Sequence, residues 1–446
     1  MKPHRPDRPP AGAGGADHKS RPGQHLAYRS RHRAASHDAA HDADEPAPVD
    51  LPAHAHIARG PAELIVDDAA LTELLHHLRA AGQFAYDTEF IGEMTYHPQL
   101  CLVQVATAQR VALIDPLAGV DLRSFWLLLA DPTVEKLVHA GAQDVEPVFR
   151  HVGQPAANVF DTQVAAGFCG MAYPVALGKL VGEVLGHRMS KGHTFTDWQR
   201  RPLSSSQLRY AADDVRFLPA VVAELRKRLA TFGHAAWVVE ECAAMCDPAR
   251  YSFDPDSDYL RVRGAGTLTV TQLGVLRALM IWRERRAIEA DCPPRSFVRD
   301  EPMIDMARHP PKSIDRLQKV KFLPRPVVER HGDEIVRLTL AALAEPPAGI
   351  RKPPHVEPTP SERFRAESVW AAAQAICLSQ GIDPAAVASR QDVADFDRAR
   401  AAGDTAALAE LPLLRGWRRQ ALGDRLTALL EGRESLSIRW ADGRLR

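Results

Sequence analysis

Two acidic side chains, Asp87 and Glu89, are separated by one residue near the end of an apolar run that begins at Phe84. Successive side chains of a strand point to opposite faces of a sheet, so these two carboxylates share one face. They repel each other, and burying both without a cation is costly. A hard divalent ion such as Mg²⁺ or Mn²⁺ would offset that cost. The alternative for this tripeptide alone is an edge strand with an acidic solvent face.

Two further segments carry acids where functional sites are common. Asp144 follows a predicted strand over 136–139 and begins a helix, and loops after strand ends often carry active sites. The alternative role for Asp144 is a helix N-cap. Tyr210 and Asp214 are four residues apart and share a helix face, whereas Asp213 points about 100° away. The alternative there is a solvated acidic turn with a core tyrosine.

The hydrophobic pattern predicts the elements that must position these acids. Short apolar runs bounded by Gly, Pro or polar residues indicate strands, and leucines at helical spacing indicate a helix over 71–78. We expect strands at 84–90, 100–106, 111–114, 136–139 and 159–161, and helices at 122–129 and 144–151. Three strands followed by strand–helix alternation indicate a mixed α/β sheet flanked by helices.

The acids in the order Asp87-x-Glu89, Asp144 and Tyr210-x-x-x-Asp214 resemble the DEDD exonuclease superfamily, in the branch whose third motif carries a tyrosine. The bacterial ribonuclease D family is a closer match, in register over about residues 63–225. Its pattern is similar at Tyr96-His-Pro-Gln-Leu, Leu102-Val-Gln, Leu113-Ile-Asp-Pro, Asp161-Thr-Gln, Thr196-Asp-Trp and Arg201-Pro-Leu. Residues 267–340, with Trp282-Arg-Glu after a leucine stripe, resemble the HRDC domain of that family.

The resemblance implies a ribonuclease H-like mixed sheet flanked by helices, followed by two all-α HRDC domains. It also implies a 3′→5′ exoribonuclease that uses two divalent metal ions, Mg²⁺ or Mn²⁺, and releases 5′-mononucleotides from tRNA precursors and other structured RNAs. Two such ions stabilise the attacking and leaving oxygens of an in-line displacement. By family match, Asp87, Glu89 and Asp214 bind the first ion, Asp87 bridges to the second, and Asp144 holds the second mainly through water. Tyr210 would orient the attacking water, because a phenol with a pKa of about 10 is mostly protonated at pH 7.

Other substrate contacts are hypotheses with a structural alternative for each. Thr88 and Phe90 flank the acidic pair, and by family analogy this segment borders the terminal nucleotide; core packing competes for Phe90. His139 would contact the substrate or pack at the strand end. Lys191 would contact a phosphate or be a solvated loop lysine.

The formal net charge is zero, with 56 Lys and Arg against 56 Asp and Glu, which excludes a uniformly basic nucleic-acid binder. The charges are segregated, because residues 60–220 carry −6 and residues 267–340 carry +4. A domain that holds divalent cations benefits from negative excess. Lys319, Lys321 and Arg325 belong to a basic run over 308–330 that would contact RNA phosphates and make binding salt dependent. The alternative is a solvated helix face.

We expect residues 1–58 to be a disordered tail, because their Pro-, Ala-, Gly-, Arg- and His-rich composition buries too little apolar surface to offset chain entropy. The remaining units are expected to be an exonuclease domain (60–235), a connecting segment (236–266), an HRDC domain (267–345), a Pro-rich linker (346–362) and a diverged HRDC-like domain placed mainly by position (363–446).

No run of about 18 apolar residues occurs, so we expect no membrane-spanning helix, and the charged start does not resemble a secretory signal. Six scattered cysteines lack zinc-site spacing, which indicates reduced thiols in a cytoplasmic protein. RNA is the expected partner, with no membrane partner and no obligate protein partner evident.

Two other functions stay open from the sequence. A DNA exonuclease of the same superfamily is one, because the spacing of the acids does not distinguish RNA from DNA. A catalytically idle RNA-binding scaffold is the other; the presence of all four carboxylates and the tyrosine argues against it.

Overall fold

The computed structural model describes residues 51–92, 94–189, 197–345, 349–350, 359–441 and 444–445. Lys191, most of the expected tail and most of the expected linker lie outside these residues. The described chain begins at Leu51, within the segment expected to be disordered. Ile57 and Ala58 are buried, and the carbonyl oxygens of Ala58 and Gly60 accept hydrogen bonds from the Arg216 guanidinium. The last residues of the expected tail therefore form part of the folded body.

Six strands form one mixed sheet in the order β1-β4-β3-β2-β5-β6, in which β3 runs antiparallel to both of its neighbours. The strands are β1 (Glu63–Ile65), β2 (Gln83–Ile91), β3 (Gln99–Ala106), β4 (Val111–Ile114), β5 (Glu135–Val138) and β6 (Val159–Asp161). The expected mixed sheet is confirmed. Strand β1 was not expected from the sequence, because three residues are too short to show an alternating pattern.

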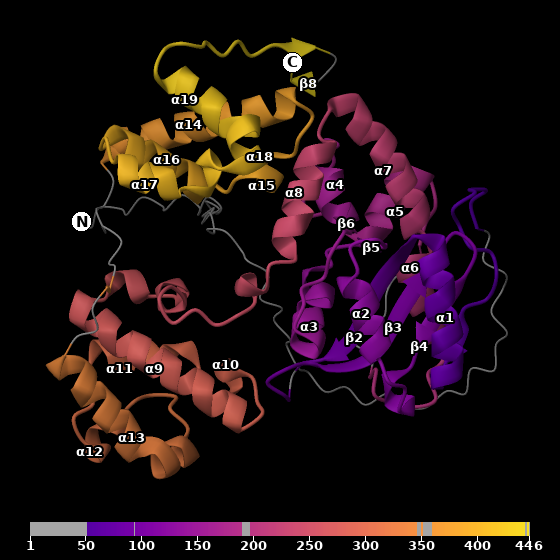
Figure 1. The fold of residues 1–446 in the computed structure, drawn as a ribbon. Coiled ribbons are helices and arrows are strands. Elements are labelled where there is room, and N and C mark those ends of the chain that lie inside the picture. Colours follow the sequence, from indigo (N-terminus) through magenta and orange to yellow (C-terminus); the bar gives the residue numbers. More distant parts are fainter. Residues whose placement is uncertain are drawn as a thin grey trace, which may run out of the picture.

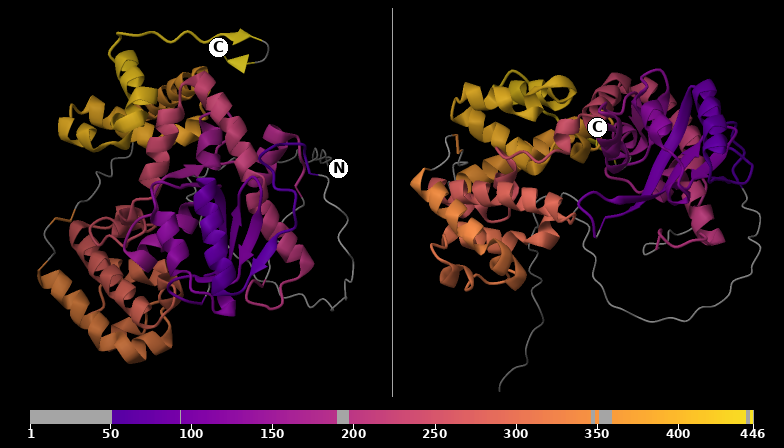
Figure 2. Two further views of the ribbon diagram at one scale, coloured as in Figure 1. Left: turned by 45° about the vertical axis from the view of Figure 1, so that its right-hand side comes forward. Right: turned by 60° about the horizontal axis from the view of Figure 1, so that its bottom comes forward.

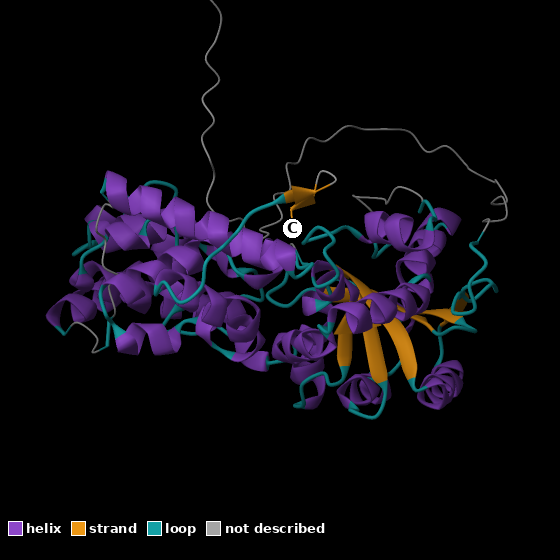
Figure 3. Ribbon diagram, turned by 90° about the horizontal axis from the view of Figure 1, so that it is seen from above, coloured by secondary structure: helices purple, strands orange, loops and turns teal. Residues whose placement is uncertain are grey.

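Helices cover both faces of this sheet, as Figure 3 shows. One side carries α1 (Asp68–Ala81), α2 (Arg123–Ala130) and α3 (Ala142–Val152), and the other carries α4 (Thr162–Gly167), α5 (Leu177–Leu185), α6 (Ser205–Arg216) and α7 (Leu218–Phe232). The alternation of β2 supplies both cores, because Phe84 and Tyr86 pack under the first group and Ala85 packs under the second. Helix α8 (Ala235–Met245) lies along β6.

A helical unit with its own apolar core follows the sheet domain and α8. It contains α9 (Val270–Glu289), α10 (Pro294–Phe297), α11 (Asp300–Arg308), α12 (Ile314–Leu317) and α13 (Arg325–Ala344). Helix α9 begins at a capping box in which the Thr269 and Gln272 side chains bond each other's backbone N–H groups. Its leucine stripe and the Trp282 ring face this core.

The C-terminal unit contains α14 (Pro360–Ser379), α15 (Pro384–Val387), α16 (Arg390–Ala401), α17 (Thr405–Glu410), α18 (Gly416–Arg418) and α19 (Asp424–Leu430), then the short strands β7 (Trp440–Ala441) and β8 (Arg444–Leu445). This unit packs against α8 and α4 and shares one apolar core with the sheet domain (Figures 1 and 2). The Trp417 ring lies 4.8 Å from the Phe168 ring, and its Nε1 donates to Glu241 at 2.9 Å. The remaining short turns are the 3-10 helices η1 (Pro116–Ala118), η2 (Pro248–Arg250), η3 (Asp258–Arg261), η4 (Ala265–Thr267) and η5 (Pro412–Leu414), and the π-helix η6 (Arg419–Gly423).

None of the helices in the described ranges combines the length and the apolar character that a membrane crossing requires.

Candidate metal and active site

Strand β2 holds the first two acids on the sheet face that α6 covers. Antiparallel pairing sets Asp87 opposite Gln104 of β3, so these side chains share a face. The neighbouring Ala85 packs in the core that contains α7, whereas Tyr86 packs in the opposite core with α2. Strand β5 pairs with the first three residues of β2, Gln83–Ala85, so β2 extends beyond β5. The end of β2 is therefore open to α3 along its edge.

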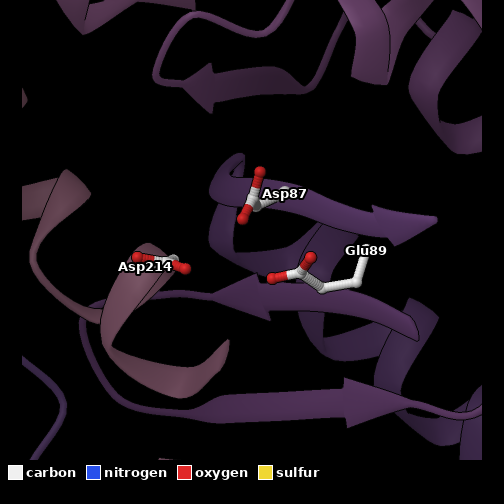
Figure 4. Close-up of side chains that lie close together, drawn as sticks. All are labelled: Asp87, Glu89 and Asp214. Carbon is white, nitrogen blue, oxygen red and sulfur yellow. The ribbon is translucent and has the colours of Figure 1, made fainter. Parts of the chain in front are cut away.

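Helix α6 brings the third acid to the same place. It begins at a capping box formed by Ser204 and Gln207 and packs across β3, β4 and β2. Asp214 points from this helix toward Asp87 and Glu89, and the carboxylate oxygens of the three residues lie within 4.8 Å of one another (Figure 4). Two sequence segments more than a hundred residues apart thus supply one cluster of hard oxygen ligands.

These three carboxylates are costly to ionise together. Burial raises the pKa of Glu89 to about 8 and that of Asp214 to about 7. The pKa of Asp87 is well above its ordinary value, because burial and then the charges of Asp144, Asp214 and Glu89 all disfavour its ionised form. A divalent cation among the three groups would remove this penalty, and oxygen ligands of this type suit Mg²⁺ or Mn²⁺. The cluster therefore fits the metal that the sequence predicted.

Asp144, the fourth predicted acid, is close to the cluster but is not a member of it. Its carboxylate accepts a hydrogen bond from the Thr88 hydroxyl, and its backbone carbonyl accepts one from the Tyr86 hydroxyl at 2.9 Å. Burial raises the pKa of Asp144 to about 6, against the opposing effect of the Thr88 hydrogen bonds. The charge of Asp144 is the largest electrostatic contribution to the raised pKa of Asp87.

The N-cap alternative for Asp144 is wrong. Helix α3 begins at Ala142 with Gly141 at the cap position, so Asp144 lies inside the first turn, and its side chain is used by Thr88. Gly141 is required there because a Cβ atom would lie 2.5 Å from the Val138 side chain. The preceding Ala140 adopts a left-handed backbone, with φ at 56°.

Asp161 holds this loop in place, and sequence reasoning gave it no role of its own. Its carboxylate accepts hydrogen bonds from the backbone N–H groups of Ala140 at 3.1 Å and Gly141 at 2.9 Å. It also caps α4 through the N–H of Gln163 at 2.7 Å. The available signal was an aspartate at the end of a short apolar strand, within the Asp161-Thr-Gln163 match.

Tyr210 lies one turn before Asp214 on α6 and hydrogen-bonds its carboxylate through the phenol hydroxyl. Burial and then the charge of Asp214 raise the pKa of Tyr210 above its ordinary value, so the phenol stays protonated. The Trp198 ring lies 6.2 Å from the Tyr210 ring and is buried in a small core beneath it. Trp198 therefore packs as an anchor beneath Tyr210.

Gln104 is a second residue that sequence reasoning left without a role. Its side chain is fully buried opposite Asp87, yet neither its amide nitrogen nor its amide oxygen has a hydrogen-bond partner among the described residues. Buried amides are normally bonded, so an unbonded one beside a cluster of acids marks a place where a further polar group fits. The signal was a polar residue inside the apolar run of β3.

The substrate-contact candidates fall in different places. Thr88 and Phe90 line a cleft of about 710 Å³ that continues past Gln143 and Pro147 of α3. His139 donates from Nε2 to the Val175 carbonyl oxygen at 3.0 Å, and its Nδ1 hydrogen-bonds the Thr162 hydroxyl at 2.9 Å, which favours the packing alternative. The three cations Lys319, Lys321 and Arg325 are exposed around the loop between α12 and α13.

The first helical unit contacts the sheet domain near this site through Tyr96, in the loop between β2 and β3. The Tyr96 hydroxyl donates to Glu284 of α9, and its backbone N–H donates to Asp291 at 3.1 Å. Sequence reasoning used Tyr96 only as part of a motif, because nothing local indicates a partner some 190 residues away.

Comparisons with known proteins agree with this geometry. Residues 62–230 match a family model described as 3′-5′ exonuclease, and residues 272–339 match the HRDC domain model. The chain is 36% identical to a ribonuclease D of Gluconacetobacter diazotrophicus, over 84% of this chain and 94% of the relative. It is 35% identical to a ribonuclease D of Acidiphilium cryptum, over 84% and 95%. The crystal structure of Escherichia coli RNase D, an exoribonuclease involved in structured RNA processing, is similar with a TM-score of 0.73 and 28% identity, covering 84% of this chain and all of that one.

Proposed function

The chain belongs to the ribonuclease D family and is a 3′→5′ exoribonuclease, and we propose that it trims the 3′ ends of tRNA precursors and other structured RNAs by two-metal-ion hydrolysis, releasing 5′-mononucleotides. The observation that carries the mechanism is the meeting of Asp87, Glu89 and Asp214 within 4.8 Å. The hydrogen bond from Tyr210 to Asp214 is the second support.

The family's exonuclease domain depends on divalent metal. Bound Mg²⁺ or Mn²⁺ ions supply Lewis-acid stabilisation of the attacking and leaving oxygens. Asp87, Glu89 and Asp214 would hold the first ion, and Asp87 and Asp144 would hold the second. Tyr210 would orient the attacking water by accepting a hydrogen bond at its hydroxyl oxygen, because its single proton is donated to Asp214 and the raised pKa makes the phenol a poor base.

The first helical unit binds RNA and so holds it near this site. Lys319, Lys321 and Arg325 contact its phosphates, and their exposure together with the net +4 of residues 267–340 supports this role. Thr88 and Phe90, on the cleft beside Asp144, contact the terminal nucleotide. The division into an exonuclease domain (60–235), an HRDC domain (267–345) and an HRDC-like domain (363–446) stays a prediction, as do the cytoplasmic location and the lack of an obligate protein partner.

The test is incubation of a 3′-extended tRNA with the purified chain and Mg²⁺ or Mn²⁺. We expect a ladder of products that shorten from the 3′ end, with release of 5′-mononucleotides that stops in EDTA. A DNA strand of matched sequence serves as the comparison substrate. Faster degradation of that DNA, or nucleotide release without divalent metal, would contradict the proposal.

A further inference from the structure

Phe322 is a solvent-exposed aromatic residue. It lies in the loop between α12 and α13, and 74% of its surface is exposed. Its backbone is in the left-handed region, with φ at 63°, a conformation that residues with a Cβ atom rarely adopt. An exposed ring on a strained backbone is unfavourable for folding, so its presence points to a use in binding.

Unpaired cations lie along the segment that carries this ring. The segment 308–330 contains seven basic side chains and the two acids Asp315 and Glu329. The basic side chains are Arg308, Lys312, Arg316, Lys319, Lys321, Arg325 and Arg330, all exposed. In the part of the chain that the structure describes, none of the seven forms an ion pair, although Arg308 donates to the Thr267 hydroxyl at 3.0 Å.

The same helical unit pairs most of its other cations. On α9, Arg283 bonds Asp300 at 2.8 Å, and Arg286 bonds Glu334 at 2.7 Å. Helix α13 begins after Pro324 with no capping side chain and no acid in its first turn, so the partial positive charge of its N-terminus adds to the same surface. Positive charge around the loop is therefore left available for an anionic ligand.

We propose that Phe322 is a stacking platform for an unpaired base of single-stranded RNA, whose phosphates Lys319, Lys321 and Arg325 contact. This inference rests on the proposed function, which identifies the anionic ligand as RNA. A ring flanked by cations fits this ligand, because each nucleotide offers an aromatic face and a phosphate. Bases in a duplex are already stacked on one another, so the platform selects an unpaired 3′ or loop segment.

The chain offers a matched control in Phe364 on α14, which is 76% exposed in an ordinary helical conformation. Its neighbours Arg363 and Arg365 are balanced by Glu362 and Glu367, and Arg365 pairs with Asp397 at 2.8 Å. An aromatic ring of nearly equal exposure therefore sits there without cationic excess. Replacing each phenylalanine by leucine removes one exposed ring and keeps an apolar side chain.

The experiment measures binding of a short single-stranded oligo(A) RNA that carries 2-aminopurine, to the full chain in EDTA so that no cleavage occurs. We expect Phe322→Leu to weaken binding roughly 5- to 140-fold, the range for loss of one base–aromatic stack. The quenching of 2-aminopurine should disappear as well. Phe322→Trp should retain both signals, and Phe364→Leu should bind like the unaltered chain. Equal affinities for Phe322→Leu and Phe364→Leu would overturn the inference.

Two further measurements separate stacking from other effects. The slope of affinity against salt should stay unchanged in Phe322→Leu and fall in Lys321→Gln, because only the second loses a phosphate contact. An RNA duplex of equal length should bind Phe322→Leu and the unaltered chain alike; equal losses for duplex and single strand would contradict a base stack. Phe322→Gly relieves the left-handed strain, so its melting temperature should not fall while its RNA affinity does.

Failure of this inference is distinguishable from failure of the proposed function. Nucleotide release by the unaltered chain with Mg²⁺ tests the function, whereas the binding comparisons in EDTA test Phe322 alone. If the chain trims RNA and its RNA affinity does not depend on Phe322, only the stacking role of Phe322 is refuted.

Discussion

The hydroxyl of Thr88 donates a hydrogen bond to the Asp144 carboxylate across the open edge where β2 extends beyond β5. Thr88 thereby holds the fourth acid next to Asp87 while leaving it outside the cluster of three. This relationship makes Thr88 a positioning residue. A substitution at Thr88 should therefore change the pH dependence of the reaction, which a purely structural role would not do.

Thr88→Val removes the donor and nearly preserves the volume. We expect kcat to fall about tenfold or more, the range for losing one hydrogen bond to a charged group. The hydrogen bond lowers the pKa of Asp144, so its loss raises that pKa and should shift the acidic limb of the pH–rate profile to higher pH. Thr88→Ser should restore both values. A pH–rate profile whose acidic limb does not move in Thr88→Val would contradict the positioning role.

Asp214→Asn should abolish nucleotide release and leave the fold intact. The asparagine still fits beside Tyr210, and removing one of three repelling carboxylates should raise the melting temperature of the metal-free protein above pH 7. Asp213→Asn is the matched control, because the adjacent Asp213 is buried against Arg216 at 3.7 Å, away from the cluster. That variant should lose stability and keep activity. Near-normal turnover by Asp214→Asn would refute the metal assignment.

Tyr210→Phe keeps the ring that packs near Trp198 and removes the hydroxyl that bonds Asp214. The single-turnover rate should drop sharply, by about a hundredfold, which is within the usual contribution of a positioned proton donor or acceptor. RNA affinity measured in EDTA should change little. An unchanged single-turnover rate would exclude a role for this hydroxyl in orienting water.

The metal-free protein should become less stable as pH rises from about 4 to about 8. In the folded state the pKa of Glu89 is about 8 and that of Asp214 about 7, both above the ordinary values of 4.5 and 3.8. The folded chain therefore binds more protons than the unfolded chain in this window, and stability falls with pH. Mg²⁺ should stabilise the protein most at the alkaline end. Thermal melts at several pH values check this prediction. The melting temperature of Glu89→Gln should depend less on pH than that of the unaltered chain, and parallel plots of melting temperature against pH would contradict it.

Gln104→Met should separate stability from activity. Replacing a buried, unbonded amide by an apolar side chain of similar volume should stabilise the metal-free fold by about 1 kcal/mol. We expect activity to fall, because the amide lies opposite Asp87 and is available to a water or ligand at the cluster. Thermal unfolding and nucleotide release measure the two effects. Full activity in a stabilised Gln104→Met protein would show that the amide serves no function.

The sequence alone determined the local elements and the set of acids. The period of two along 84–90 correctly predicted that Asp87 and Glu89 share a face, and the four-residue spacing correctly predicted that Tyr210 and Asp214 do. These predictions succeed because side-chain direction within one element depends only on backbone geometry.

Only the tertiary structure decided which elements meet. Periodicity indicates that a face is buried but does not name its partner, so the contact of α6 with β2, the bond from Thr88 to Asp144 and the bond from Tyr96 to Glu284 were not predictable from local pattern. The same holds for the C-terminal unit, whose Trp417 completes the core of the sheet domain. Such contacts depend on shape and charge complementarity between segments far apart in the chain, and that information is present only once the chain has folded.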